Sequence, residues 1–388
     1  MQSLLDELGG WTMTRIAGGV VDRDAVLAAL ANWEAEIEPD DAALLYFVGH
    51  GGVVEIRDLP APLGGRPVFY VATERPGAKW QFEGILDVEL SLVVARVDRI
   101  CANVTVIVDS CYSARTVRGP AWVLERSPAW LRELDTALDR NDCDALLHPT
   151  SHPRVVRLAG SSSLRMSFAD PTDEGHLARL TGLFVDVVRE AGNDIGRLTW
   201  DAVAHRVREQ AIWRSGCEEQ WVSLAGPRQR LVFSRDEAPL PRTVGFVPHE
   251  PGAGWIRAGA LQGVELGDEW GLAALTLDDG LQPRWIARMR VTEVDLSRAA
   301  LVQIDGNDVH AAPGTSAWLL EAETRELVRV DGPDALREAV ARSAWLSPVG
   351  HGDSRLAICQ SDQNRIELRA EDDQYAPSTF RADARGRA

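Results

Sequence analysis

The chain has 388 residues, 45% of them hydrophobic, and it carries a formal net charge of −17. This length suits two domains, and the apolar fraction is sufficient for a sizeable core. The acidity argues against nucleic acid and against an anionic membrane surface as partners, because both require a basic face.

Apolar runs in the first half of the chain predict buried strands of a parallel sheet. The runs do not alternate with polar residues, which is typical of strands that are covered on both faces. They lie at 42–48, 104–108 and 155–159. Helical periodicity predicts helices at 3–8, 22–36, 87–99, about 176–191 and 199–212. Strands that alternate with helices indicate an α/β domain with a mainly parallel sheet.

The character of the sequence changes near Asp236. Residues 236–250 are rich in proline and are expected to form a linker. Between 251 and 370, short apolar segments separated by glycine turns predict a β-rich domain, either a small barrel or a sandwich. Residues 371–388 are polar and are expected to form a flexible tail. The predicted organisation is therefore an α/β domain over 1–235 followed by a smaller β-rich domain.

Each of the three predicted strands ends in a polar cluster. The clusters are Gly49-His50-Gly51-Gly52, Asp109-Ser110-Cys111 and Gly160-Ser161-Ser162-Ser163. Ligands bind outside the carboxyl ends of parallel strands, so the three clusters are expected at one edge of the sheet. A cysteine nucleophile needs a proton carrier, and an imidazole nearby lowers the pKa of the thiol. The pattern therefore predicts catalysis by Cys111 and His50.

The two polar strand ends resemble the active-site strands of caspases and metacaspases. An apolar strand ending in Gly-His-Gly-Gly precedes one that continues as Val-Asp-Ser-Cys-Tyr-Ser-Ala, in the order found in that family. The segments VVRLAGSSS, GLFVDVVRE and EEQWVSLAGP resemble the strand, helix and final strand that follow. The resemblance covers roughly residues 1–235. It implies a three-layer caspase-like fold, and bacterial relatives of this kind often act in defence or regulated cell death.

The resemblance also implies roles for individual residues. Cys111 is the nucleophile, His50 is the acid and base, and the backbone N–H groups of Gly51 and Cys111 form the oxyanion hole. Asp109 stands where metacaspases and paracaspases have an aspartate that lines the pocket for an Arg or Lys side chain. Ser161 and Ser162 fall in the substrate-lining loop, and Asp170 is a second acidic candidate beyond it. For Asp109, a role in capping a turn stays open as the alternative.

The sequence departs from the family at its beginning. The strand and helix that usually open the domain are missing, so either the sheet is short of a strand or the protein begins upstream. Val48 also stands where metacaspases often have serine, two residues before the histidine. Both departures bear on the preference for basic substrates and leave the catalytic pair untouched.

The expected activity is hydrolysis of peptide bonds after Arg, or Lys, by the pair Cys111 and His50. Partners are therefore protein or peptide substrates with a basic residue before the scissile bond. The connection 115–154 is long, irregular and rich in arginine, and the resemblance implies maturation by a cut there, so self-cleavage or cleavage by an upstream activating protease is expected after one of its arginines. A regulatory protein is the other partner considered. Two alternatives remain: a non-catalytic caspase-like scaffold, and a thiol hydrolase of small amides.

The cysteines and the chain ends bear on cofactors and location. The 5 cysteines are scattered and form no CxxC pair, which indicates neither a disulfide scaffold nor a zinc site. No cofactor is expected, and the calcium activation known in many metacaspases has no residue assigned to it here. No run approaches the roughly 20 apolar residues of a membrane helix, and the N-terminus lacks the basic region of a signal peptide. A cytoplasmic location is predicted.

Overall fold

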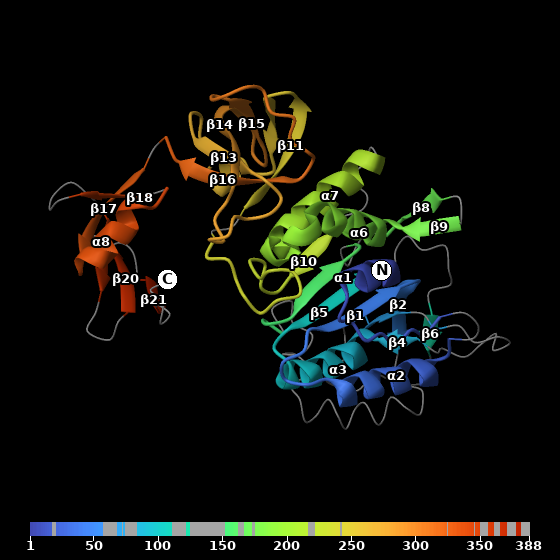
Figure 1. Cartoon of the computed structure of the whole chain (residues 1–388). Helices are drawn as coiled ribbons and strands as arrows, with labels where there is room; N and C mark the ends of the chain where they lie inside the picture. Colours follow the sequence, from blue (N-terminus) through green and yellow to red (C-terminus); the bar gives the residue numbers. More distant parts are fainter. Residues whose placement is uncertain are drawn as a thin grey trace. The chain divides into compact units, whose positions relative to one another are not determined.

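The computed structural model describes most of the chain (Figure 1). The described residues are 1–17, 21–56, 68–71, 73, 84–110, 122–124, 152–161, 167–172, 175–215, 222–240, 243–323, 325–344, 346–349, 356–360, 365–370 and 378–381.

A mixed sheet forms the centre of the first part of the chain. Its strand order is β1-β5-β7-β10, where β1, β5 and β7 are parallel and β10 is antiparallel to β7. The strands are β1 (Ala43–Val48), β5 (Val104–Asp109), β7 (Val156–Ala159) and β10 (Ser223–Ala225). Every residue of β5 is buried, as its unbroken apolar sequence predicts for a strand covered on both faces.

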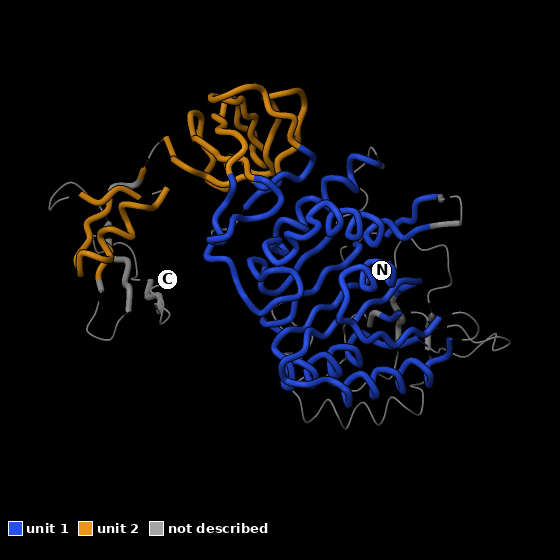
Figure 2. Tube along the Cα trace, viewed as in Figure 1, with its two compact units in different colours: residues 1–245, 274–284, 312–316 blue, residues 246–273, 285–311, 317–388 orange. Residues whose placement is uncertain are grey.

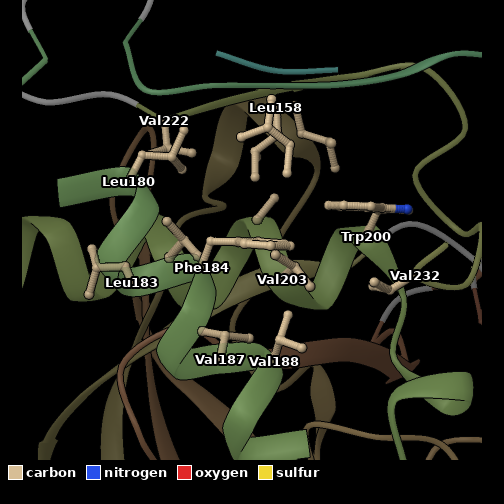
Figure 3. Packing of buried hydrophobic residues seen from close by; sticks show 14 of the residues in the cluster. Leu158, Leu180, Leu183, Phe184, Val187, Val188, Trp200, Val203, Val222 and Val232 are labelled. Carbon is tan, nitrogen blue, oxygen red and sulfur yellow. The ribbon is translucent and has the colours of Figure 1, made fainter. Parts of the chain in front are cut away.

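Helices cover both faces of this sheet (Figure 1). They are α1 (Gln2–Leu8), α2 (Arg23–Glu36), α3 (Asp87–Ile100), α6 (Arg179–Ala191) and α7 (Trp200–Ser215). One hydrophobic cluster joins α2 and α3 to one face of the sheet, and a larger one joins α1, α6 and α7 to the other. The larger cluster centres on Phe184 and Trp200, whose rings stack with centroids 5.8 Å apart (Figure 3). Each such buried side chain stabilises the fold by about 1.5–3 kcal/mol.

Smaller β elements and a 3₁₀ helix accompany this core. A second sheet has the order β4-β3-β2-β6, and β8 pairs with β9 in a hairpin. The elements are β2 (Gly51–Ile56), β3 (Val68–Val71), β4 (Ile85–Leu86), β6 (Trp122–Leu124), β8 (Ala169–Thr172), β9 (Gly175–Ala178) and the 3₁₀ helix η2 (Gly192–Arg197).

The second half of the chain forms a closed antiparallel barrel and a further sheet. The barrel has the order β11-β12-β15-β14-β13-β16, and the sheet has the order β18-β17-β19-β20-β21. Along β14, buried Ala287, Met289 and Val291 alternate with exposed residues, which is the period of a barrel wall. The barrel elements are β11 (Val244–Glu250), β12 (Ala253–Ile256), η3 (Ala260–Gln262), β13 (Glu269–Ala273), β14 (Trp285–Val294), β15 (Ala299–Gln303) and β16 (Thr315–Glu321). The elements of the sheet are β17 (Glu326–Asp331), α8 (Asp334–Ala341), β18 (Leu346–Val349), β19 (Leu356–Gln360), β20 (Arg365–Ala370) and β21 (Ser378–Arg381).

The chain divides into two compact units (Figure 2). Unit 1 comprises residues 1–245, 274–284 and 312–316, and unit 2 comprises residues 246–273, 285–311 and 317–388. Two connections between barrel strands therefore belong to unit 1. In the first of them, Leu277 packs with Leu231 and Ala238 and its backbone N–H donates to the carbonyl of Arg197 at 2.9 Å.

The positions of the predicted strands and helices of the first half are confirmed, and the β-rich second half is a barrel with an additional sheet. The predicted burial holds for β5, whereas β1, at the end of the described strand order, is mostly half-buried. Three boundaries are wrong. The helix predicted from 176 begins at Arg179, because Gly175–Ala178 pairs across the β8–β9 hairpin. The linker predicted to 250 ends earlier, since Val244–Glu250 is a barrel strand. Within the predicted tail, Ser378–Arg381 pairs with β20, and the rest of it lies outside the described residues.

The part of the chain that the structure describes contains no helix with both the length and the apolar character needed to cross a membrane.

Candidate functional site

The carboxyl ends of β1, β5 and β7 lie side by side. Val48 of β1 pairs with Asp109 of β5, and Val108 pairs with Ala159 of β7. Backbone hydrogen bonds continue past the strand ends: Gly49 N–H donates to the Asp109 carbonyl at 3.3 Å, and Gly160 N–H donates to the Val108 carbonyl at 2.8 Å. The described residues of the three polar clusters therefore lie at the ends of neighbouring strands, at the same edge of the sheet.

The predicted site residues differ in how they are placed. His50 is exposed directly after β1, and Gly51 is buried as the first residue of β2, opposite Val71. Cys111 and Ser162 lie outside the described residues. Ser161 is buried, and its hydroxyl donates to the backbone carbonyl of Ser110 at 3.2 Å. The Ser110 hydroxyl is itself buried and has no hydrogen-bond partner among the described residues.

Asp109, the last residue of β5, is 2% exposed and is held on both carboxylate oxygens. Oδ1 accepts a hydrogen bond from the Ser167 hydroxyl at 2.7 Å. Oδ2 accepts from the backbone N–H and from the hydroxyl of Thr181, each at 2.8 Å. Burial raises the pKa of the Asp109 carboxyl, and the hydrogen bonds from Ser167 and Thr181 counter part of that rise. No described Arg, Lys or His forms an ion pair with it.

Thr181 connects Asp109 to β1. The Thr181 hydroxyl donates its hydrogen bond to Asp109. The Thr181 oxygen therefore accepts a hydrogen bond from the Tyr46 hydroxyl, 2.9 Å away. Burial raises the pKa of Tyr46 to about 12, while its hydrogen bond to Thr181 lowers that pKa and the charge of Asp109 raises it further. Tyr46 therefore stays protonated as a donor at neutral pH. We call Tyr46, Asp109, Ser167 and Thr181 the Asp109 network.

Sequence reasoning found Asp109 and missed the other members of this network. Tyr46 belongs to an apolar strand, and Thr181 belongs to the first turn of a predicted helix, where nothing in the local sequence marks its hydroxyl. Ser167 lies in a segment without a regular pattern. Only the packing of distant segments brings the Ser167 and Thr181 hydroxyls to the carboxylate and the Tyr46 hydroxyl to Thr181, so no local signal points to them.

Asp170, the second acidic candidate, is engaged by an arginine. Its Oδ1 accepts from Arg179 Nε at 2.9 Å and from Nη2 at 2.6 Å. The Arg179 guanidinium also lies over the ring of Phe168, 5.5 Å from the centroid, and Arg179 N–H donates to the Phe168 carbonyl at 2.9 Å. These contacts fasten the base of the β8–β9 hairpin to the first residue of α6.

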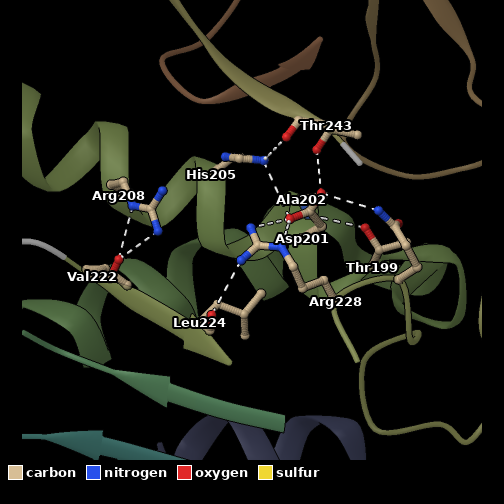
Figure 4. A network of polar contacts seen from close by, with 10 residues as sticks. Thr199, Asp201, Ala202, His205, Arg208, Val222, Leu224, Arg228 and Thr243 are labelled. Atoms are coloured by element: carbon tan, nitrogen blue, oxygen red, sulfur yellow. Dashed lines mark hydrogen bonds and ion pairs between the residues drawn. The ribbon is translucent and has the colours of Figure 1, made fainter. Parts of the chain in front are cut away.

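A second buried polar network lies at the start of α7 (Figure 4). Asp201 is 1% exposed and accepts from Arg228 Nε at 2.7 Å and from the Thr243 hydroxyl at 2.5 Å. His205 Nε2 lies 3.5 Å from Asp201 Oδ1 and 3.2 Å from the Thr243 carbonyl. Burial acts to raise the pKa of Asp201, but the hydrogen bond and charge of His205, the charge of Arg228 and the Thr243 hydroxyl hold it well below its usual range. This network joins α7 to the segment after β10, which contains Arg228, and to Thr243, the residue before β11.

Among the described residues, no group of three or more His, Cys, Asp or Glu side chains is arranged to hold a metal ion.

No protein-family model matches the chain, and no curated protein matches it. The crystal structure of protein GSU0716 from Geobacter sulfurreducens is similar to it at 16% sequence identity, over 53% of this chain and 74% of that chain, with a TM-score of 0.34. A likeness at that TM-score supports no conclusion about activity. The function is therefore argued from the residues of the site.

Proposed function

We propose that this chain is a caspase-like cysteine endopeptidase with Cys111 as nucleophile and His50 as acid and base. The observation that carries the proposal is the register between β1 and β5. Val48 and Asp109 form the last register pair, and His50 and Cys111 each follow that pair by two residues along the chain. Equal offsets from a register pair of neighbouring parallel strands support the proposal, because a thiol–imidazole pair requires both residues at one edge of the sheet.

In the proposed reaction the Cys111 thiolate attacks the carbonyl carbon of the scissile peptide bond. The oxygen of that carbonyl takes up the negative charge and accepts hydrogen bonds from the backbone N–H groups of Gly51 and Cys111. His50 gives a proton to the leaving amine as the C–N bond breaks, which leaves a thioester on Cys111. His50 then takes a proton from water as the water attacks the thioester carbon, and the C–S bond breaks to release the acid product and restore the Cys111 thiolate beside protonated His50.

The preference for Arg or Lys before the scissile bond is part of the proposal and rests on the family resemblance. The net charge of −17 supports it, because an acidic protein attracts basic peptides. Neither acidic candidate is an open acceptor in the described residues, since Asp109 is bonded to Ser167 and Thr181 and Asp170 to Arg179. Selectivity must therefore be measured independently of the catalytic pair.

The test is turnover of fluorogenic peptides that differ only in the residue before the scissile bond. We expect cleavage after Arg or Lys, and we expect Cys111→Ala and His50→Ala each to lower it by about three orders of magnitude or more, because members of a catalytic unit fail together. Cys359→Ser is the matched control, since that half-buried thiol lies on β19 of unit 2.

Four results would change the assignment. Near-full turnover by Cys111→Ala would show that the proposed nucleophile is wrong. Cleavage after Asp in preference to Arg would keep the catalytic pair and overturn the specificity. Absence of cleavage by the unaltered chain, together with an unreactive Cys111 thiol, would favour the non-catalytic scaffold, whereas cleavage of simple amides alone would favour a thiol hydrolase.

A further inference from the structure

The Asp109 carboxylate occupies a position from which it cannot easily serve as a substrate acceptor. The side chain is buried, with 2% of the residue exposed, and it accepts three hydrogen bonds from the protein itself. A carboxylate offers about four lone-pair sites, and three of those on Asp109 are taken by donors of the protein itself. A substrate arginine that gripped both oxygens would have to displace a Thr181 donor from Oδ2.

The same contacts tie together elements that meet at the proposed site. Asp109 ends β5, Tyr46 lies within β1, Thr181 lies in the first turn of α6, and Ser167 precedes the β8–β9 hairpin. Hydrogen bonds to an ionised carboxylate are shorter and stronger than neutral ones, and burial within a low-dielectric environment strengthens them further.

The N-terminus of α6 depends on this carboxylate. The cap residue Ala178 has no side chain that can accept a hydrogen bond, and the backbone N–H of Thr181 has no intrahelical acceptor. Asp109 supplies that acceptor from the neighbouring strand, and its negative charge is favourable at the positive end of the helix dipole. The Asp109 carboxylate thus caps the N-terminus of α6 in place of a side chain of the helix's own cap residue.

Gly160 leaves the room that this arrangement needs. A Cβ at Gly160 would lie 2.7 Å from Asp109 Oδ1 and 2.8 Å from the Ser167 hydroxyl oxygen. Both contacts are shorter than nonbonded carbon and oxygen atoms tolerate, so β7 must be followed by a residue without a side chain beside the carboxylate.

From this geometry we infer that Asp109 is a positioning residue, which holds the end of β5 against α6 and β1 so that the cysteine two residues later is aligned with the histidine that follows β1. The inference rests on the proposed peptidase function. It assigns Asp109 to alignment for every substrate rather than to the choice of one side chain.

The decisive experiment separates alignment from selectivity with Asp109→Asn. The amide keeps the shape but presents N–H groups where the carboxylate accepted hydrogen bonds. We expect kcat to fall about 10²-fold for peptides with Arg, Lys or a neutral residue before the scissile bond, with KM nearly unchanged, because small misplacement of reacting groups has effects of that order. A loss confined to basic peptides, or one carried by KM, would overturn the inference.

Conservative variants of the partners make the test independent of Asp109 itself. Thr181→Val removes the bridging hydroxyl and should lower kcat for all peptides, whereas Thr181→Ser retains the hydroxyl and should restore it. Asp186→Asn, on the exposed side of the same helix, should leave activity unchanged. If Asp109→Asn does not fold, Thr181→Val and Ser167→Ala still decide the outcome, because both keep the charge of the carboxylate.

A second readout does not require peptidase activity. The rate of alkylation of Cys111 by iodoacetamide, followed by peptide mapping as a function of pH, reports directly on the environment of the thiol. We expect Asp109→Asn and Thr181→Val to change this rate and its pH profile at Cys111 but not at Cys359. If the unaltered chain cleaves no peptide, the proposed function fails, but the alkylation rate still tests the positioning role of Asp109. If the alkylation of Cys111 and kcat are both unchanged in the two variants, the positioning role is refuted.

Discussion

Asp109 and Asp201 are both buried, and the pKa of one is raised while that of the other is lowered. Asp109 is surrounded by hydroxyl and amide donors, so desolvation dominates. Asp201 faces Arg228 and His205, whose charge and hydrogen bonding outweigh desolvation. A neutral donor stabilises a carboxylate less than a cation does, which accounts for the difference. The two aspartates therefore have different consequences for the protein.

Loss of the Asp201 charge should destabilise the fold. Asp201→Asn leaves the Arg228 guanidinium without its carboxylate, and we expect the free energy of unfolding to fall by about 3 kcal/mol at pH 7, near the lower end for a buried pair because Arg228 keeps some contact with water. Chemical denaturation measures the change. Asp186→Asn is the control, because Asp186 pairs with Arg214 at the surface. It should change the free energy of unfolding by less than about 1 kcal/mol. Equal effects from the two variants would contradict a special role for Asp201.

The pH dependence of that difference follows from the sign of the pKa shift. The folded-state pKa of Asp201 lies below the ordinary value of 3.8, so its stabilising contribution is complete above that value and is lost as the pH falls towards the folded-state pKa. The difference in unfolding free energy between the unaltered chain and Asp201→Asn should therefore be constant from pH 7 to about pH 5 and shrink only in the acid range.

At the scale of elements, α7 contacts segments that are distant from it in sequence. Thr243, which precedes β11, bonds to Asp201 and His205 on this helix. Gly314 lies against the helix backbone, where a Cβ would come within 2.3 Å of the His205 carbonyl oxygen and 2.6 Å of the Arg206 Cα. Its φ of +81° also falls in the left-handed region that favours glycine.

Gly314→Ala should therefore destabilise unit 1. Backbone strain alone is expected to cost about 1–3 kcal/mol, and the clash with the α7 backbone adds to it. Gly192→Ala provides the comparison within the same unit, because Gly192 has a φ of +55° but no atom within 4 Å of the added Cβ. Thermal unfolding of both variants measures the difference, and a Gly314→Ala chain as stable as Gly192→Ala would mean that residues 312–316 do not pack on α7 in solution.

At the scale of the molecule, the division into units does not follow a single cut in the chain. Residues 274–284 and 312–316 connect barrel strands but belong to unit 1. Leu277 packs with Leu231 and Ala238, and Arg197 pairs with Asp279. The region expected to be a separate β-rich domain therefore supplies part of the fold of the α/β unit.

This arrangement predicts that two truncations have different effects. A chain that ends at Arg235 loses Thr243, Leu277 and Gly314 and should unfold about 5 °C or more below the full chain, because each buried leucine contributes about 1.5–3 kcal/mol and 1 kcal/mol corresponds to about 2–4 °C in a unit of this size. A chain that ends at Glu323 retains all unit 1 segments and should keep its stability and its peptidase activity. Equal stability of unit 1 in the two truncated chains would show that the connections contribute nothing.

The amino-acid sequence by itself determines the buried strands, the helices between them and the polar clusters at the strand ends. Apolar runs such as 104–108 and periodic helices such as Arg179–Ala191 carry their own signals, since local periodicity reflects which face of an element is covered. Short strands and glycine turns in the second half likewise predict a small barrel or a sandwich, and the structure has a barrel. His50 and Asp109 stand out because polar residues directly follow apolar strands.

Only the tertiary structure decides what surrounds those residues. Ser167 and Thr181 bond to Asp109 from two other segments, and Tyr46 bonds in turn to Thr181, so a residue that resembled a substrate acceptor already has hydrogen-bond donors on both oxygens. The strand at Val244–Glu250 and the unit 1 membership of residues 274–284 were likewise invisible, because pairing and packing partners lie far along the chain. Periodicity reports the burial of a face, whereas the identity of the groups that meet there depends on contacts that no local pattern encodes.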